Sequence, residues 1–463
     1  MLHTVVISDI HLCEAERESG IWMRYRQAAY SPASEIASML AAVRARVRGD
    51  RLCLVLNGDV FDFDAPRVKG RTSVFHDEPR DAEHGCAALG AILDDHPEFV
   101  RALGDVLAEG HELIFVSGNH DAHLTLPAVR ELLADRLVEA ARVALAQGRP
   151  CQPSDHRHPL RDRVRFRAWF HRTDDGIIVE HGHQYDGYCP HREPMLPYDA
   201  AERAVQPTMG SLVARHMVAR MGYFNPHVDG TYELSALGYL LHWARYYAVS
   251  SHSLVVAWAV GAVRTLARLV RARFAPSRQR KRRALVEAAR ETGTSLLAIA
   301  RHARLFAKPA EDRLHLVFRV LWVDRVLLCA ASVLTALVVG LAARSALLGI
   351  LVGPTVLLVY ELAIPKQPLD AVWTSVQRIA RRVAAVHRAR AVVFGHTHRA
   401  DGAWEDGVFY GNSGSWSAAF HDPECTRPLD RARPVIWLRS DDGGRLAGGL
   451  ARWAGGGFVD EPA

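Results

Sequence analysis

The residues of this 463-residue chain that are best suited to chemistry form five short polar clusters, and each cluster directly follows an apolar run. The clusters contain aspartate carboxylates, an asparagine amide and several imidazoles, but no cysteine. This donor set suits Mn²⁺, Fe or Zn²⁺ rather than an iron–sulfur cluster or a structural zinc site. The clusters are Asp9–His11, Gly58–Asp62, Gly118–Asp121, His181–His183 and Gly395–His398.

The number of donors in these clusters indicates two metal ions rather than one. A single tetrahedral zinc ion takes four ligands, and the clusters offer more. A carboxylate that bridges two ions about 3.5–4 Å apart would use the whole set, and such a pair activates hydroxide and neutralises phosphoryl charge. We therefore expect a dinuclear metal site.

The segments that must position these clusters alternate between two patterns. Short apolar runs predict buried strands, and helix-spaced apolar residues between them predict helices over Ile36–Arg48, Ala87–Ala108 and Pro127–Ala146. This alternation predicts an α/β fold, in which the carboxyl ends of the strands form the ligand-binding edge. The predicted strands are Thr4–Ile7, Leu52–Leu56, Leu113–Val116, Val164–Phe170, Ile177–Val179, Ala391–Phe394, Gly407–Tyr410 and Val435–Leu438.

A long helical block interrupts this alternation. From about residue 199 to residue 390 the chain is rich in Ala, Leu, Val and Arg and has few turn-forming residues. The strands after the block carry residues that complete the early clusters, so we interpret the block as an insertion rather than as a second domain in tandem. The predicted organisation is a catalytic domain formed by residues 1–198 and 391–463, with a helical insertion at 199–390.

Two adjacent apolar runs within the block, together residues 326–364, form a candidate membrane hairpin. Val326–Ala343 and Ser345–Ile364 are 18 and 20 residues long, and Glu361 and the intervening Arg344 are the only charges. A transmembrane helix needs about 20 apolar residues. Because both flanks are basic, the positive-inside rule predicts that the catalytic domain lies at the cytoplasmic face. A pair of buried helices in a soluble domain, or an oligomer interface, is the alternative.

The charge of the chain is local. The formal net charge is +6, but Arg264–Arg283 alone holds nine basic and no acidic residues, so the remainder is negative. Such a patch fits phospholipid headgroups, and we expect no nucleic-acid partner because no basic groove is interleaved with aromatic residues. The apolar content of 49% and charged content of 23% exclude a disordered chain.

The cysteines and the N-terminus favour the cytoplasm. The seven cysteines lie far apart and form no C-x-x-C pair, which is typical of a reducing compartment. The segment before Ser8 is too short and too uncharged for a signal peptide. The cysteines are Cys13, Cys53, Cys86, Cys151, Cys189, Cys329 and Cys425.

Taken in order, the clusters read D-x-H, G-D-x-x-D, G-N-H-D, H-G-H and G-H-T-H, and this series resembles the calcineurin-like metallophosphoesterase superfamily. Asn412–Trp416 also looks like the segment that follows the last histidine pair of that family. The resemblance implies a four-layer αββα sandwich with two divalent metal ions, Mn²⁺ first and Fe, Zn²⁺ or Ni²⁺ as alternatives. Ser8–Leu12 and Gly58–Asp62 are further similar to motifs of UDP-2,3-diacylglucosamine pyrophosphatases, which typically have Arg in place of His120.

The resemblance implies a role for several residues. His120 would stabilise the transition state or protonate the leaving oxygen, and Asp62 would orient it. His183 stands where many relatives have Asp, Thr or Ser, and no role follows for it. Other histidines, such as His191, are interpreted as ordinary surface or hydrogen-bonded residues. The implied metal ligands are Asp9, His11 and His398 for one ion, Asn119, His181 and His396 for the other, and Asp59 as the bridge.

The implied reaction is hydrolysis of a phosphate ester or a pyrophosphate by a metal-bridging hydroxide, without a covalent intermediate. If the hairpin enters a membrane, a lipid-linked substrate at the cytoplasmic face becomes attractive. The alternatives are a phosphodiesterase or phosphoprotein phosphatase with a soluble substrate, or an inactive membrane-tethered scaffold of the same fold. An oligomeric state does not follow from the sequence.

Overall fold

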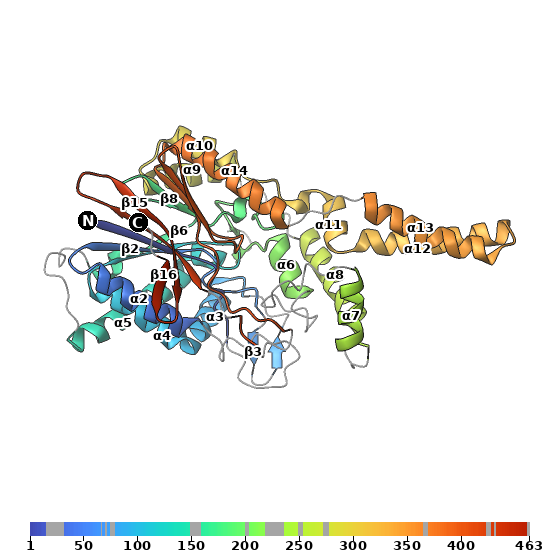
Figure 1. Cartoon of the computed structure of the whole chain (residues 1–463), viewed down its shortest axis with the longest axis horizontal. Helices are drawn as coiled ribbons and strands as arrows, with labels where there is room; N and C mark the ends of the chain where they lie inside the picture. Colours follow the sequence, from blue (N-terminus) through green and yellow to red (C-terminus); the bar gives the residue numbers. More distant parts are fainter. Residues whose placement is uncertain are drawn as a thin grey trace.

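The structure of the chain is a computed structural model, and it shows a mixed α/β fold with two main β-sheets (Figure 1). The predicted α/β fold is thus confirmed. The structure describes residues 1–14, 32–65, 67–69, 72–74, 79–148, 159–199, 203–217, 236–248, 253–271, 277–363, 369–422, 427–429 and 432–460.

The larger sheet has seven strands in the order β16-β15-β14-β1-β2-β5-β6. Strands β1, β2, β5 and β6 run parallel, and β14 lies antiparallel to β1. The last part of the chain therefore completes the sheet that the first part begins. The strands are β1 (Leu2–Ile7), β2 (Arg51–Asn57), β5 (Glu112–Val116), β6 (Val164–Arg167), β14 (Arg433–Ser440), β15 (Leu446–Ala454) and β16 (Gly457–Asp460).

The smaller sheet has five strands in the order β12-β13-β11-β8-β7. Strand β11 runs parallel to both β8 and β13, so this sheet also combines residues from before and after the helical block. Its strands are β7 (Phe170–Arg172), β8 (Ile177–Glu180), β11 (Ala391–Phe394), β12 (Asp401–Glu405) and β13 (Val408–Asn412). Two separate two-stranded ribbons pair β3 (Arg67–Lys69) with β4 (Thr72–Val74) and β9 (Tyr198–Asp199) with β10 (Ala204–Val205). The domain boundaries stay a prediction.

The two sheets pack face to face through one apolar cluster. Val6, Val55 and Ile114 from the larger sheet join Val179 and Val393 from the smaller one, and all five side chains are fully buried. Branched side chains of this kind suit buried parallel strands, which are covered on both faces. The carboxyl ends of β1, β2, β8 and β11 are thereby held close to one another across the two sheets.

Helices cover the outer faces of both sheets. Val5 and Ile7 of β1 point away from Val6, as alternation along a strand requires, and they pack against the helices on the larger sheet. Val392 of β11 packs in the same way against the helices on the smaller sheet. The helices on the larger sheet are α2 (Ala33–Arg46), α3 (Ala82–Asp95), α4 (Pro97–Ala108) and α5 (Pro127–Ala146), and those on the smaller sheet are α9 (Arg278–Thr292), α10 (Leu296–Ala303) and α14 (Leu369–His387).

Two predicted elements are wrong in their extent. The helix predicted over Ala87–Ala108 is two helices, α3 and α4, because the residue before a proline is disfavoured in helical conformation and His96 precedes Pro97. The strand predicted over Val164–Phe170 is two strands, β6 and β7, which belong to different sheets. The apolar pattern indicated extended structure there but not the change of sheet.

The rest of the helical block projects from the body of the molecule, and its end is a long hairpin (Figure 1). Helices α12 and α13 pack against each other, and the chain turns between them at Arg344, which has a left-handed φ of 47°. Of the described helices, α12 alone is long and apolar enough to cross a membrane, with a mean hydropathy of 2.2. The helices of this part are α6 (Met209–His216), α7 (Ala236–Tyr246), α8 (Leu254–Arg271), α11 (Leu314–Val320), α12 (Val323–Ala342) and α13 (Ala346–Ala363).

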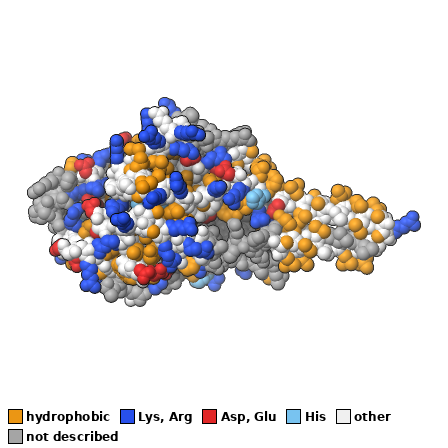
Figure 2. Space-filling model, turned by 90° about the horizontal axis from the view of Figure 1, so that it is seen from above, with side chains coloured by type: hydrophobic (Ala, Val, Ile, Leu, Met, Phe, Trp, Pro, Cys, Tyr) orange, Lys and Arg blue, Asp and Glu red, His pale blue; other side chains and the backbone are white. Residues whose placement is uncertain are grey.

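The surface of this hairpin is apolar. Figure 2 shows hydrophobic side chains along the projection and basic side chains spread over the body. Leu334 and Leu341 of α12 are 63% and 78% exposed, and Leu362 of α13 is 77% exposed. Helices packed in a soluble core would bury these side chains, so the alternative of a pair of buried helices does not describe this hairpin. Residue 364, the predicted end of the second run, lies outside the described residues.

The cysteines of the described segments form no disulfide with one another. Cys13 and Cys53 are buried, Cys86 and Cys189 are partly buried, and Cys329 is exposed. The absence of a disulfide framework from the whole chain stays a prediction. Cys151 and Cys425 lie outside the described residues.

One buried histidine should make the fold sensitive to acid. Burial lowers the pKa of His171 in β7 to about 3, and Arg167 and Arg165 lower it further. An unfolded chain has the ordinary histidine pKa of about 6.5, so below that pH the unfolded state binds a proton that the folded state does not. Stability is therefore lost as the pH falls from about 6.5 towards 3, and this one residue should account for about 2 kcal/mol at pH 5.

The free energy of unfolding of the wild-type protein should fall between pH 7 and pH 5. In the variant His171→Phe this fall should be smaller by about 2 kcal/mol, as measured by urea denaturation. The exposed His421 provides the control, because its imidazole contacts water in both states. An unchanged pH dependence in His171→Phe would contradict the prediction.

Candidate metal centre

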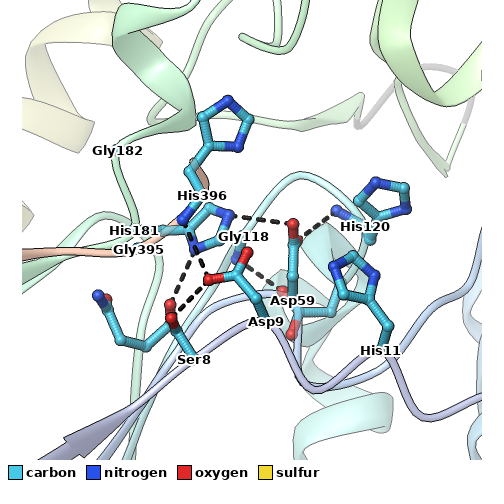
Figure 3. A network of polar contacts seen from close by, with 12 residues as sticks. Ser8, Asp9, His11, Asp59, Gly118, His120, His181, Gly182, Gly395 and His396 are labelled. Carbon is cyan, nitrogen blue, oxygen red and sulfur yellow. Dashed lines mark hydrogen bonds and ion pairs between the residues drawn. The ribbon is translucent and has the colours of Figure 1, made fainter. Parts of the chain in front are cut away.

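The five polar clusters meet where β1, β2, β5, β8 and β11 end (Figure 3). Asp9 follows β1 and Asp59 follows β2 in one sheet, while His181 follows β8 and His396 follows β11 in the other. Figure 3 shows the side chains of Asp9, Asp59 and His181 pointing toward one another. The structure thus brings together residues that lie far apart in the chain, such as His396 and Asp9, which are 387 positions apart.

The first group of donors consists of Asp9, His11 and His398. One ligand atom of each lies within 4.8 Å of the others. The Nε2 atom of His398 is 3.2 Å from Oδ1 of Asp9 and 3.4 Å from Nε2 of His11. These three residues are the set that the resemblance assigns to one ion.

The second group consists of Asp59, His181 and His396, again with ligand atoms within 4.8 Å of one another. The Nε2 atom of His181 lies 3.0 Å from Oδ2 of Asp59. Asn119 lies on the adjoining loop, where the backbone N–H of His120 donates to Oδ1 of Asp59 at 2.8 Å. The Oδ1 atom of Asn119 is buried and accepts no hydrogen bond from the described residues. The roles of these residues as metal ligands stay a prediction.

The hydrogen bonds of the imidazoles show that these donors fit a cation. Nδ1 of His181 donates to the carbonyl oxygen of Asn57 at 2.8 Å, so in the neutral ring Nε2 turns a lone pair toward Asp59. Nε2 of His396 lies 3.1 Å from Oδ2 of Asp186. When Nε2–H donates to this carboxylate, Nδ1 of the neutral ring carries the lone pair. Imidazoles that bind metals are typically fixed in this way by a carbonyl or a carboxylate.

The charges of this site are almost fully buried. Asp9 has no exposed surface and Asp59 is 2% exposed. Burial alone would raise the pKa of each carboxyl, but the neighbouring histidines outweigh it, and the pKa of Asp59 falls well below its usual value. Burial lowers the pKa of His181, whereas Asp59 and Asp9 raise it, to about 9 in total. A proton on His181 therefore balances the carboxylates, and a bound cation would displace that proton.

The backbone is strained at these residues. Ten described residues other than glycine have a positive φ, and five of them are predicted metal ligands. L-residues adopt this region rarely, and such strain persists only where the surrounding structure enforces it. Here the backbone N–H groups of Ile10 and His11 both donate to the carbonyl oxygen of Asp59 at 2.9 Å. The five residues are Asp9 (53°), His11 (53°), Asp59 (51°), His396 (65°) and His398 (57°).

Glycines allow the ligand loops to approach one another. A Cβ atom on Gly118 would lie 2.2 Å from Oδ1 of Asp59, and one on Gly58 would lie 2.4 Å from Nδ1 of His181. Gly58 also has a φ of 78°, which a residue with a side chain adopts at a cost. These positions therefore need glycine for packing around the donors.

His120 lies beside the two donor groups, with its ring centroid 4.9 Å from that of His11. Its Nδ1 atom is 3.1 Å from Oδ1 of Asp62, the contact that the sequence predicted, and 3.2 Å from Oδ2 of Asp64. Burial lowers the pKa of His120, but Asp62 and Asp59 raise it well above its usual value. His120 is therefore held as an imidazolium, which can donate a proton.

A further carboxylate ties the loops together. Asp121 is fully buried, and its Oδ1 and Oδ2 atoms accept hydrogen bonds from the backbone N–H groups of Gly118, at 2.6 Å, and Val60, at 2.8 Å. Burial and the neighbouring Asp59 raise the pKa of Asp121 to about 7. Asp121 thus fixes the distance between the loop that carries Asp59 and the loop that carries His120.

Two residues that contact this site were not predicted from the sequence. Asp64 is two positions beyond Asp62, so the extended motif G-D-x-F-D-x-D offered a signal for it. Asp186 accepts hydrogen bonds from Nε2 of His396 and from the backbone N–H of Tyr188, and nothing in the sequence pointed to it. His183 lies beside the centre with both ring nitrogens buried and unpartnered among the described residues, outside both donor groups.

Comparison of the sequence with models of known protein families gave no match, and comparison with curated proteins gave no match either. The resemblance to the metallophosphoesterases therefore depends on the order of the motifs in the sequence. The geometry of the two donor groups is an independent observation of the structure.

Substituting Gly118 by alanine tests whether close packing assembles the centre. The added methyl group must displace Asp59, so Gly118→Ala should weaken Mn²⁺ binding at least tenfold and lower the free energy of unfolding by about 1–3 kcal/mol. Titration calorimetry and urea denaturation measure the two effects.

Gly90→Ala is the matched control, because a Cβ atom there meets nothing within 4 Å and the position is helical. This variant should bind Mn²⁺ normally and be stabilised by up to about 1 kcal/mol. Equal behaviour of the two variants would show that the tight approach at Gly118 does not support the donors.

Proposed function

We propose that the chain is a hydrolase of phosphate esters or pyrophosphates that depends on two divalent metal ions, with the αββα sandwich of the calcineurin-like metallophosphoesterases. The observation that carries the proposal is the pair of adjacent donor groups at the strand ends, with His120 beside them. The face-to-face packing of two sheets with helices on their outer faces agrees with this sandwich.

The donor set suits a pair of Mn²⁺ ions, with Fe, Zn²⁺ or Ni²⁺ as alternatives, because it offers oxygen and imidazole nitrogen without thiolate. When bound, two such ions neutralise charge on a phosphoryl group and make water a stronger nucleophile at neutral pH. Asp9, His11 and His398 would hold one ion, Asn119, His181 and His396 the other, and Asp59 both.

The residues of the chain then orient the substrate and transfer protons. Asp62 and Asp64 both face Nδ1 of His120, so they fix the ring and stabilise its charged form. His120 donates a proton to the leaving oxygen of the ester as its bond to phosphorus breaks. The intact set of donors argues against an inactive scaffold.

The exposed hairpin supports a membrane location for this activity. Helices α12 and α13 present leucine and valine side chains on a projection, and Arg319 and Arg325 lie near its base. Such a surface is costly in water and stable in a bilayer, and basic residues favour the cytoplasmic side. The proposed substrate is accordingly lipid-linked and is reached at the cytoplasmic face, with a soluble phosphodiester or phosphoprotein as the alternative.

The variant Asp59→Asn tests the shared ligand. The loss of one negative charge and one donor should weaken the binding of both ions and lower kcat/KM for p-nitrophenyl phosphate esters by more than about a hundredfold. Even changes to residues that only contact metal ligands lower metal affinity or activity by about 10–100-fold. Asp442→Asn is the control, because that carboxylate is 98% exposed. Near-normal turnover in Asp59→Asn would refute the bridging role.

Deleting residues 326–364 tests the membrane contact. The full chain should sediment with membranes after a carbonate wash, whereas the deleted chain should stay in the supernatant and still hydrolyse a soluble ester. Identical fractionation of the two proteins would remove the support for a lipid-linked substrate. Retained ester hydrolysis shows that the shortened chain is folded.

A further inference from the structure

A small cavity borders the candidate metal centre and separates it from the helical block. Asn119 and Asp64, from the loops that carry the centre, line it together with Leu212 and Arg215 of α6. Its volume is about 30 Å³, which is enough for one or two hydroxyl-sized groups. The insertion therefore provides one wall of a space next to the reacting groups.

His191 lines this cavity and is 2% exposed. Its Nδ1 atom lies 2.8 Å from the carbonyl oxygen of Gln206, and because a carbonyl only accepts, Nδ1 carries the proton. Burial lowers the pKa of His191 to about 4, so the ring is neutral near pH 7. Its Nε2 atom is then an acceptor, and it has no hydrogen-bond partner among the described residues.

A metal ion does not account for this free acceptor. The groups of three or more metal-binding side chains found in the described part of the chain do not include His191. A buried acceptor without a partner is costly, whereas a hydroxyl group that donates to it removes that cost. The chemistry that fits Nε2 of His191 is therefore a neutral hydrogen-bond donor that fits a small space.

The position of the cavity relates it to the leaving group of the proposed reaction. Asp64 both lines the cavity and lies 3.2 Å from Nδ1 of His120. The leaving oxygen must lie near His120 to receive its proton, and Asn119 and Asp64 both line the cavity, so the alcohol part of the substrate would lie near it. Phe63, which stacks on His123 at a centroid distance of 4.1 Å, gives this space an apolar side.

We propose that Nε2 of His191 accepts a hydrogen bond from a hydroxyl group on the alcohol part of the substrate, so that the site selects phosphate esters of polyols or sugars over simple alkyl esters. This inference rests on the proposed function and names the substrate class of the same site. His191 determines specificity by binding, and His120 and the metal ligands carry out the reaction. The selectivity arises because an alkyl ester leaves the buried acceptor unpaired.

The test compares kcat/KM for glycerol 3-phosphate and propyl phosphate in the full chain loaded with Mn²⁺. The wild-type protein should prefer the glycerol ester by about tenfold to a hundredfold, the discrimination expected when a buried polar group is left unpaired. The variant His191→Asn places an amide N–H where Nδ1 was, which preserves the bond to Gln206 but removes the distal acceptor. In this variant, and in His191→Phe, the preference should fall to about onefold to threefold.

His421→Asn is the control, since His421 is exposed and should leave the wild-type preference intact. A second readout uses analogues that cannot be hydrolysed. Calorimetry should show the same preference for 3,4-dihydroxybutyl phosphonate over butyl phosphonate in the wild-type protein, and its loss in His191→Asn. Circular dichroism identifies a variant that has failed to fold.

Two results would overturn the inference while the proposed function stands: the wild-type protein hydrolyses both esters equally, or His191→Asn keeps the wild-type preference. A wild-type protein that binds Mn²⁺ but hydrolyses no phosphate ester would refute the proposed function, and the inference would fall with it. Loss of the preference in both His191 variants, with the control unchanged, supports the assignment.

Discussion

The burial of two carboxylates next to each other constrains this structure more than any other interaction. Asp9 and Asp59 belong to one sheet and are almost completely shielded from water, so their charge must be balanced inside the protein. Two of the balancing imidazoles, His398 for Asp9 and His181 for both carboxylates, follow strands of the other sheet. The site therefore exists only when the two sheets pack face to face, and its charge balance depends on the same contact that forms the core.

This dependence explains why local strain and close packing gather at the strand ends. The ligands adopt left-handed backbone conformations and glycines meet side chains at the same loops. Strain of this kind is stable only where many contacts enforce it, and the bonds to the carbonyl oxygen of Asp59 and to the carboxylate of Asp121 are such contacts. The free energy gained by burying the strands offsets the cost of the strained loop conformations that hold the donor atoms in place.

The helices of the helical block fall into two parts with different positions. Its helices α9, α10 and α14 cover the smaller sheet and belong to the globular body, whereas α12 and α13 project with an apolar surface. Between these parts, α6 lines the cavity beside His191 and packs on α8. Helix α8 in turn contacts the link between α11 and α12, where Trp258 donates to the carbonyl oxygen of Leu321. A continuous series of packed helices thus connects the hairpin to the edge of the site.

The sequence by itself determined the α/β class, most strand positions and the residue types of the donor set, because burial sets the spacing of apolar residues and metal chemistry limits the donors. The division of Val164–Phe170 between two sheets and the placement of Asp186 beside His396 were decided only by the tertiary structure. The break at His96, in contrast, follows from Pro97 and is a property of the sequence. His191, interpreted from sequence as an ordinary histidine, proved to be buried beside the centre. Sequence patterns predict local structure and burial, whereas these contacts join distant segments that only the packing of sheets and helices brings together.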